Sequence, residues 1–66
     1  MIRELDTVES LVDLPGEGML AGALGTVIAI FDVPTEAYEV EFCDASGRTI
    51  AQVALLPEQL RKCHGP

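Results

Sequence analysis

A turn punctuated by glycines runs directly into a β-branched segment between Ala21 and Asp32, and this stretch constrains the fold more than any other. Gly22 and Gly25 precede the run Thr26-Val27-Ile28-Ala29-Ile30-Phe31. A run that is apolar at nearly every position is typical of a strand covered on both faces. A glycine at the start of a strand indicates a bulge, or a backbone that passes too close to a neighbour for any Cβ. We therefore predict the central strand of a small sheet here.

The cleanest alternation lies from Ala37 to Cys43. Tyr38, Val40 and Phe42 alternate with Glu39 and Glu41, which predicts a strand with one buried and one solvated face. Three other segments, Leu5 to Val12, Arg48 to Leu56 and Leu60 to Cys63, are also predicted to be strands.

Four turn signals separate these strands. Pro15 and Gly16 suit a type II turn, with Gly16 at positive φ, and they begin a long loop that extends to Ala23. Residues 32–36 form the second turn. The segment from Asp44 to Gly47 suits a tight hairpin with the glycine in the left-handed region. Pro57 begins a single helical turn over residues 57–60.

The order of these parts predicts an all-β fold, a small five-stranded SH3-like barrel. One long loop lies between strands 1 and 2, and a single helical turn precedes strand 5. We expect the sheet to close on itself, because closure removes the exposed edges that make apolar strands aggregate.

Length sets further limits. A chain of 66 residues is near the lower limit for independent folding, so we predict one domain over residues 1–66. Its apolar content of 48% exceeds what one small core can hold. We therefore expect a dimer or higher homo-oligomer that buries the remaining apolar residues. The candidates are Ile28, Ile30, Ile50, Met19 and Leu20.

Charge indicates the class of partner. Eleven acidic residues against four basic ones give a net charge of −7, a field that repels phosphate backbones and anionic membranes and attracts basic proteins. No segment has the ~20 apolar residues of a membrane span, and residues 1–6 do not resemble a signal peptide. We expect a cytoplasmic protein that binds a basic protein partner, with no membrane and no nucleic acid among its partners.

No motif predicts catalysis or a cofactor. The glycines at 16, 18, 22 and 25 precede a strand, whereas a phosphate-binding loop needs a helix N-terminus after it. Cys43, Cys63 and His64 are the soft metal donors, and Cys63 and His64 would point to opposite faces of a strand. A lone histidine in a terminal tail lacks a group to orient it as a general base. We expect a protein that is not an enzyme, with two reduced thiols.

Two acidic surfaces are candidates for partner binding. The first combines Glu36, Glu39, Glu41 and Asp44, and the second combines Asp13, Glu17 and Met19 in the long loop.

Several segments, taken in the same order along the chain, resemble a family of small bacterial proteins, domain of unknown function 4926. They are Glu4-Leu5-Asp6-Thr7-Val8, Asp13-Leu14-Pro15, Ala21-Gly22-x-x-Gly25-Thr26-Val27, Ala37-Tyr38-Glu39-Val40-Glu41-Phe42, Asp44 to Gly47 with Arg48-Thr49, and Leu56-Pro57-x-x-Gln59-Leu60-Arg61. The resemblance implies an SH3-like barrel with no assigned activity and no catalytic residues. Because some relatives are encoded beside toxin-like proteins, it also implies an alternative, an antitoxin or immunity role against the product of a neighbouring gene.

A second resemblance, through Gly22-x-x-Gly25-Thr26-Val27, is to the KOW-type barrels of transcription and ribosomal proteins. It implies nucleic-acid or ribonucleoprotein association as a further alternative. The chain differs from those barrels in charge, because Arg3, Arg48, Arg61 and Lys62 are its only cations.

Overall fold

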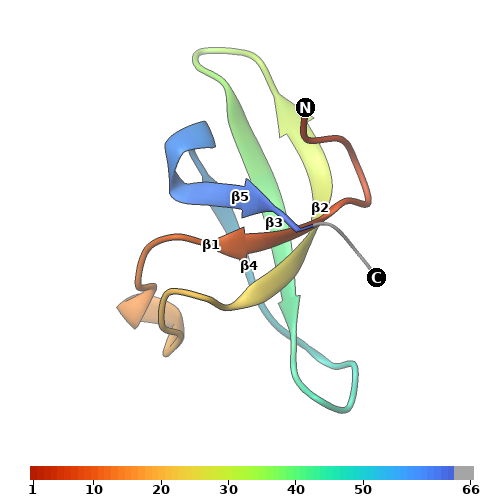
Figure 1. The fold of residues 1–66 in the computed structure, drawn as a ribbon, viewed down its shortest axis with the longest axis vertical. Coiled ribbons are helices and arrows are strands. Elements are labelled where there is room, and N and C mark those ends of the chain that lie inside the picture. Colours follow the sequence, from red (N-terminus) through yellow and green to blue (C-terminus); the bar gives the residue numbers. More distant parts are fainter. Residues whose placement is uncertain (64–66) are drawn as a thin grey trace.

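Five antiparallel strands form one sheet in the computed structural model, which describes residues 1–63 (Figure 1). The strand order in the sheet is β4-β3-β2-β1-β5. The elements are β1 (Thr7–Ser10), η1 (Pro15–Glu17), β2 (Leu24–Phe31), β3 (Ala37–Cys43), β4 (Thr49–Leu55), η2 (Pro57–Gln59) and β5 (Leu60–Lys62), where η marks a single 3-10 turn. The predicted all-β fold, a five-stranded SH3-like barrel with a long first loop and a helical turn before strand 5, is confirmed.

The core lies on the inner face of this sheet. Val8, Val27, Val40 and Phe42 are at most 1% exposed, and they come from three neighbouring strands. The register explains this burial, since Val27 pairs with Val40 and both side chains of such a pair point to one face. Leu14, Tyr38, Leu55 and Leu60 complete the core.

Gly25 lies where two strands approach closely. A Cβ on this residue would lie 2.6 Å from Val40 Cγ1 and 2.9 Å from the carbonyl oxygen of Glu41. The close approach predicted for Gly25 is therefore correct. The bulge lies farther along β2, where the register with β3 shifts between Val27 and Ala29.

The long loop differs from the prediction at its first turn. Pro15 begins the 3-10 turn η1, and the left-handed residue is Gly18, at φ 70°, whereas Gly16 has no positive φ. The type II turn at Pro15 and Gly16 is thus wrong. A 3-10 turn also accepts proline at its first position, because that position needs no N–H donor, so the proline did not distinguish the two turns. The predicted left-handed Gly47, at φ 83°, is confirmed.

The second half of β2 is less covered than expected. Ile30 and Phe31 are 39% and 45% exposed. In the first half of the strand Gly25 and Val27 are buried, whereas Thr26 and Ile28 on the opposite face are only partly buried. The prediction of a strand buried on both faces is therefore wrong. Ile30 and Phe31 extend into the β2–β3 hairpin, the loop at the top of Figure 1. A hairpin end that projects beyond the short strand β1 has no neighbour to cover it.

The first strand is also shorter than predicted, because a turn occupies its beginning. The Asp6 N–H donates to the Arg3 carbonyl at 3.1 Å, and Leu5 adopts a left-handed φ of 72°. Leu5 still bonds to the sheet, since its N–H donates to the Val27 carbonyl at 2.7 Å.

The sheet has two free edges. β4 and β5 are the outermost strands of the order, and no pairing joins them within residues 1–63. The expected closure of the sheet on itself is therefore wrong, and the barrel is partly open. At the other end, β5 is held to β1 by pairs that include Ser10 with Leu60.

Candidate functional site

The solvent face of β3 carries the two best-placed acidic side chains, Glu39 and Glu41. Their neighbours Tyr38, Val40 and Phe42 are buried, so strand alternation directs both glutamates outward. Residues two apart on a strand lie ~7 Å apart. Both glutamates are partly exposed. The predicted pair therefore forms one acidic row, which we call the β3 acidic row.

The other two acids of this predicted surface lie at opposite ends of β3 and are already engaged. Glu36 precedes the strand and accepts a hydrogen bond from the Tyr38 hydroxyl at 2.6 Å. This bond, and burial to a smaller extent, raise the pKa of Tyr38 above its ordinary value of 10.0. Asp44 follows the strand and accepts from the backbone N–H groups of Ser46 and Arg48 at 2.9 and 3.0 Å. Both carboxylates thus stabilise local structure.

The second predicted surface is divided in the same way. The Asp13 carboxylate accepts from the Ala21 N–H at 2.8 Å, which ties the two ends of the long loop together. Met19 bonds to Leu14 through both backbone groups and packs against the core. Glu17, on η1, is exposed. The structure therefore leaves Glu17 as the freely exposed side chain of this set.

A shallow, open depression of about 130 Å³ adjoins the β3 acidic row. Its floor crosses three strands, because Thr7 pairs with Thr26 and Thr26 pairs with Glu41. Leu24, Gly25 and Cys43 complete the lining. The lining of this depression combines two hydroxyl groups, a carboxylate, a thiol and an apolar side chain. Sequence reasoning missed the threonines, because only the register across three strands brings them beside Glu41.

One polar contact already orients Glu41. The Thr49 hydroxyl on β4 donates to Glu41 Oε2 at 3.0 Å. The other carboxylate oxygen of Glu41 accepts no hydrogen bond within residues 1–63. A carboxylate has about four acceptor positions, so Glu41 can still accept hydrogen bonds from a cationic group.

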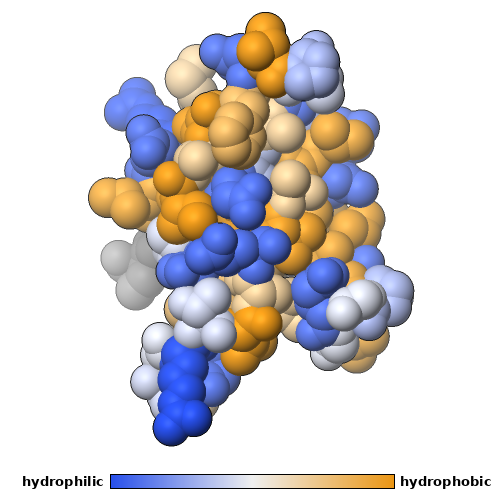
Figure 2. Space-filling model, turned by 180° about the vertical axis from the view of Figure 1, so that it is seen from behind, coloured by the Kyte–Doolittle hydropathy of each residue, from blue (hydrophilic) through white to orange (hydrophobic). Residues whose placement is uncertain are grey.

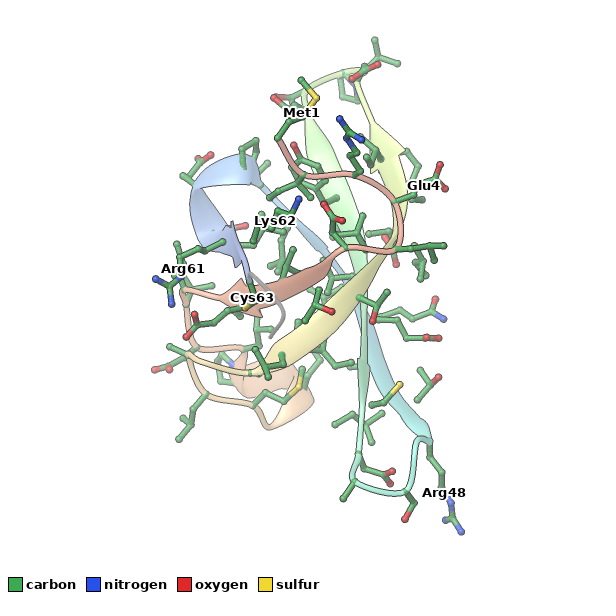
Figure 3. All side chains as sticks on the ribbon, turned by 45° about the vertical axis from the view of Figure 1, so that its right-hand side comes forward. Met1, Glu4, Arg48, Arg61, Lys62 and Cys63 are labelled. Atoms are coloured by element: carbon green, nitrogen blue, oxygen red, sulfur yellow. The ribbon has the colours of Figure 1, made fainter. Side chains whose placement is uncertain are left out.

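The two cations of β5, Arg61 and Lys62 (Figure 3), form ion pairs with acidic residues in and just before β1. The Glu9 carboxylate accepts from the guanidinium of Arg61, through Nε at 3.1 Å, and this bond raises the pKa of Arg61. Lys62 Nζ lies 3.4 Å from Asp6 Oδ2. The pKa of Asp6 is lowered, first by the hydrogen bond from the Arg3 N–H at 2.8 Å and further by Lys62. These partly exposed ion pairs therefore lie along a seam that the backbone pairing of β1 with β5 joins.

Metal-ligating groups do not converge in the described structure. Within residues 1–63, no three His, Cys, Asp or Glu side chains form a group that could hold a metal ion. Cys43 is exposed, Cys63 is half-buried, and both are free thiols. His64, the remaining soft donor named from the sequence, lies outside the described residues. No helix in this part of the chain is long and apolar enough to cross a membrane.

The strand order, the 3-10 turn before β5 and the small core define the protein as a small SH3-like barrel domain. The model of the family described as domain of unknown function (DUF4926) matches residues 4–62. The chain belongs to this family. No curated protein and no solved structure matches the chain.

Proposed function

We propose that the chain is a non-catalytic protein-interaction module that binds a basic protein through the β3 acidic row. The observation that carries this proposal is that Glu39 and Glu41 lie on one solvent face without an ion pair. In residues 1–63 the two ion pairs are Arg61 with Glu9 and Lys62 with Asp6, and both lie on the β1–β5 seam.

The depression beside Glu41 supports a basic side chain as the contacting group. A lysine or arginine has an apolar stem and a cationic end. Leu24, which is 60% exposed, can cover the stem, while Glu41 and the two threonine hydroxyls accept from the cation. A depression of about 130 Å³ is well below the ~300 Å³ or more of an ordinary small-molecule pocket. This size favours one inserted side chain over a small ligand.

The distribution of the cations argues against nucleic acid as the partner. Binding to phosphates needs several clustered lysines or arginines. Arg61 and Lys62 are paired at the seam, and Arg48 lies apart from them at the tip of the β3–β4 hairpin (Figure 3). Among the described residues, no cation lies in the strands beside the β3 acidic row.

A titration with a defined probe tests the proposal. We expect a short lysine- and arginine-rich peptide to shift the amide resonances of Thr7, Thr26 and Glu41 in an NMR titration. The apparent affinity should fall as salt rises, because exposed charges interact over a Debye length of only ~8 Å at physiological ionic strength.

A matched pair of variants gives the control. Glu39→Gln with Glu41→Gln removes two charges from the β3 acidic row, and Glu4→Gln with Glu58→Gln removes two exposed charges elsewhere. The first pair should abolish the localised shifts and the recovery of any basic protein from native lysate, and the second pair should preserve both. Equal losses in the two double variants would show that binding is due to net charge alone and would contradict the proposed surface.

A further inference from the structure

The outer edge of β4 offers unpaired backbone groups. β4 pairs with β3 on one side, and no backbone N–H or C=O of residues 49–55 bonds to any other segment within residues 1–63. Figure 1 shows β4 as a distant strand at the back of the sheet, and Figure 2 shows that side of the molecule with apolar side chains on both sides of a hydrophilic band. A free edge of this length is a template for another strand.

β4 also lacks the features that normally protect an edge strand. Proteins block such edges with charged residues, proline or very short strands. The sequence from Thr49 to Leu56 contains no charged residue, no proline and no glycine. The other edge strand, β5, has three residues, two of them cations. The one irregularity of β4, the register shift against Cys43, lies at the start of the strand and leaves Ala51 to Leu55 regular.

The inner face of β4 is incompletely covered, which also favours a further strand beside this edge. Val40 and Phe42 on β3 are 0% and 1% exposed. Their direct partners on β4, Val53 and Ala51, pack against the same core but are only partly buried. A further strand beside β4 would cover them.

We infer that this edge pairs with β4 of a second copy of the chain, antiparallel, about a twofold axis at Val53. The order of side-chain sizes is self-complementary in this register. Val53 meets its own copy, and Ala51 lies opposite Leu55 on the inner face, so small and large side chains alternate. On the outer face Gln52 lies opposite Ala54. Cross-strand pairs of β-branched residues stabilise a sheet, and a twofold interface requires one surface that complements itself.

Charge also favours a second copy at this position. Two chains of net charge −7 repel each other, and β4 is an uncharged strand at an edge. In the paired sheet the nearest glutamates of the two β3 strands are separated by three strand spacings, ~14 Å. This distance exceeds the ~8 Å Debye length at physiological salt, so β4 is where two copies meet with little repulsion. The inference does not rest on the proposed function.

Sedimentation equilibrium of the full chain tests the pairing. The short interface should associate weakly, with a Kd between ~10 µM and ~1 mM, so the mass should rise with concentration from 7.1 kDa toward twice that value.

Two double variants, each changed at positions 52 and 54, allow a direct comparison of dimer affinity. Gln52→Glu with Ala54→Lys places opposite charges across the axis and should tighten the dimer ~3-fold or more, whereas Gln52→Lys with Ala54→Lys places like charges there and should weaken it ~10-fold or more.

Monomer stability separates this effect from misfolding. Gln52 pairs with Glu41 in the monomer, so lysine at position 52 should raise the melting temperature of the dilute protein relative to glutamate. The predicted order of dimer affinity is therefore the reverse of the order of monomer stability. A wild-type chain that stays at 7.1 kDa at ~1 mM, or a dimer unaffected by both double variants, overturns the inference.

Discussion

Replacement of Gly25 by alanine tests the closest contact in the sheet. The added Cβ would lie 2.6 Å from Val40 Cγ1 and 2.9 Å from Phe42 Cδ1, and also 2.9 Å from the backbone oxygen of Glu41. Real Cβ atoms do not approach other atoms so closely. A rotation of the valine side chain cannot relieve the backbone contact, so β2 and β3 must separate locally.

The magnitude follows from two opposing effects. Overpacking in a well-packed core costs ~1–3 kcal/mol, and the backbone contact places Gly25→Ala in the upper part of that range. Alanine restricts the unfolded chain more than glycine does, which returns ~0.5–1 kcal/mol. The free energy of unfolding should therefore fall by about 1–2 kcal/mol. For a domain of this size each kcal/mol lowers the melting temperature by ~4–8 °C.

Thermal and urea unfolding followed by circular dichroism measure this change. Gly16→Ala is the matched control, since a Cβ at Gly16 meets no atom within 4 Å and its φ is not positive. That variant should be unchanged or up to ~0.5 kcal/mol more stable. Equal melting temperatures for Gly25→Ala and Gly16→Ala would refute the reasoning that close strand packing requires glycine at position 25.

Three further measurements follow from the fold. Leu5→Asn should raise the free energy of unfolding by ~0.5–1 kcal/mol, because the left-handed φ of 72° strains a leucine that is 78% exposed. The control Leu20→Asn should give no gain in stability, because Leu20 is similarly exposed but has no positive φ. Absorbance titration of Tyr38, the single tyrosine, should show a pKa above 10.0 that falls in the Glu36→Gln variant, and an unchanged pKa in that variant would contradict the hydrogen bond. Because the pKa of Tyr38 is raised in the folded state, the free energy of unfolding should decrease as pH rises from the unfolded pKa of ~10 toward the folded pKa. Ser10→Ala should cost ~0.5–1.5 kcal/mol in urea unfolding, because the buried hydroxyl donates to the Val12 carbonyl at 2.7 Å, and a cost near zero would mean that water replaces this bond.

The strands were predictable because the local pattern and the tertiary fold agree. The alternation around Glu39 and Glu41 fixed β3 at Ala37–Cys43 with both bounds correct. The hairpin glycine and the proline before β5 were equally informative, since Gly47 and Pro57 have local roles that no distant contact alters.

What the sequence could not show depends on contacts between distant segments. The exposure of Ile30 follows from the short length of β1, which leaves the end of β2 uncovered. The free edge of β4 depends on how far the sheet curls, which no local pattern encodes. The threonines beside Glu41 meet only through the register of three strands. The predicted acidic surface around Glu39 was divided for a similar reason, because Glu36 and Asp44 bond to nearby groups.

The seam between β1 and β5 has a consequence for synthesis of the chain. Glu9 and Arg61 are 52 positions apart, and Leu60 supplies a core side chain from the last strand. A ribosome delivers the first four strands before this final one, so a nascent chain carries β1 with one side unpaired until residues 60–62 have emerged. Contacts of such long sequence separation form slowly. A chain whose first four strands have emerged without residues 60–62 therefore presents two strands with an unpaired side at once, β1 as well as β4, to chaperones or to other chains.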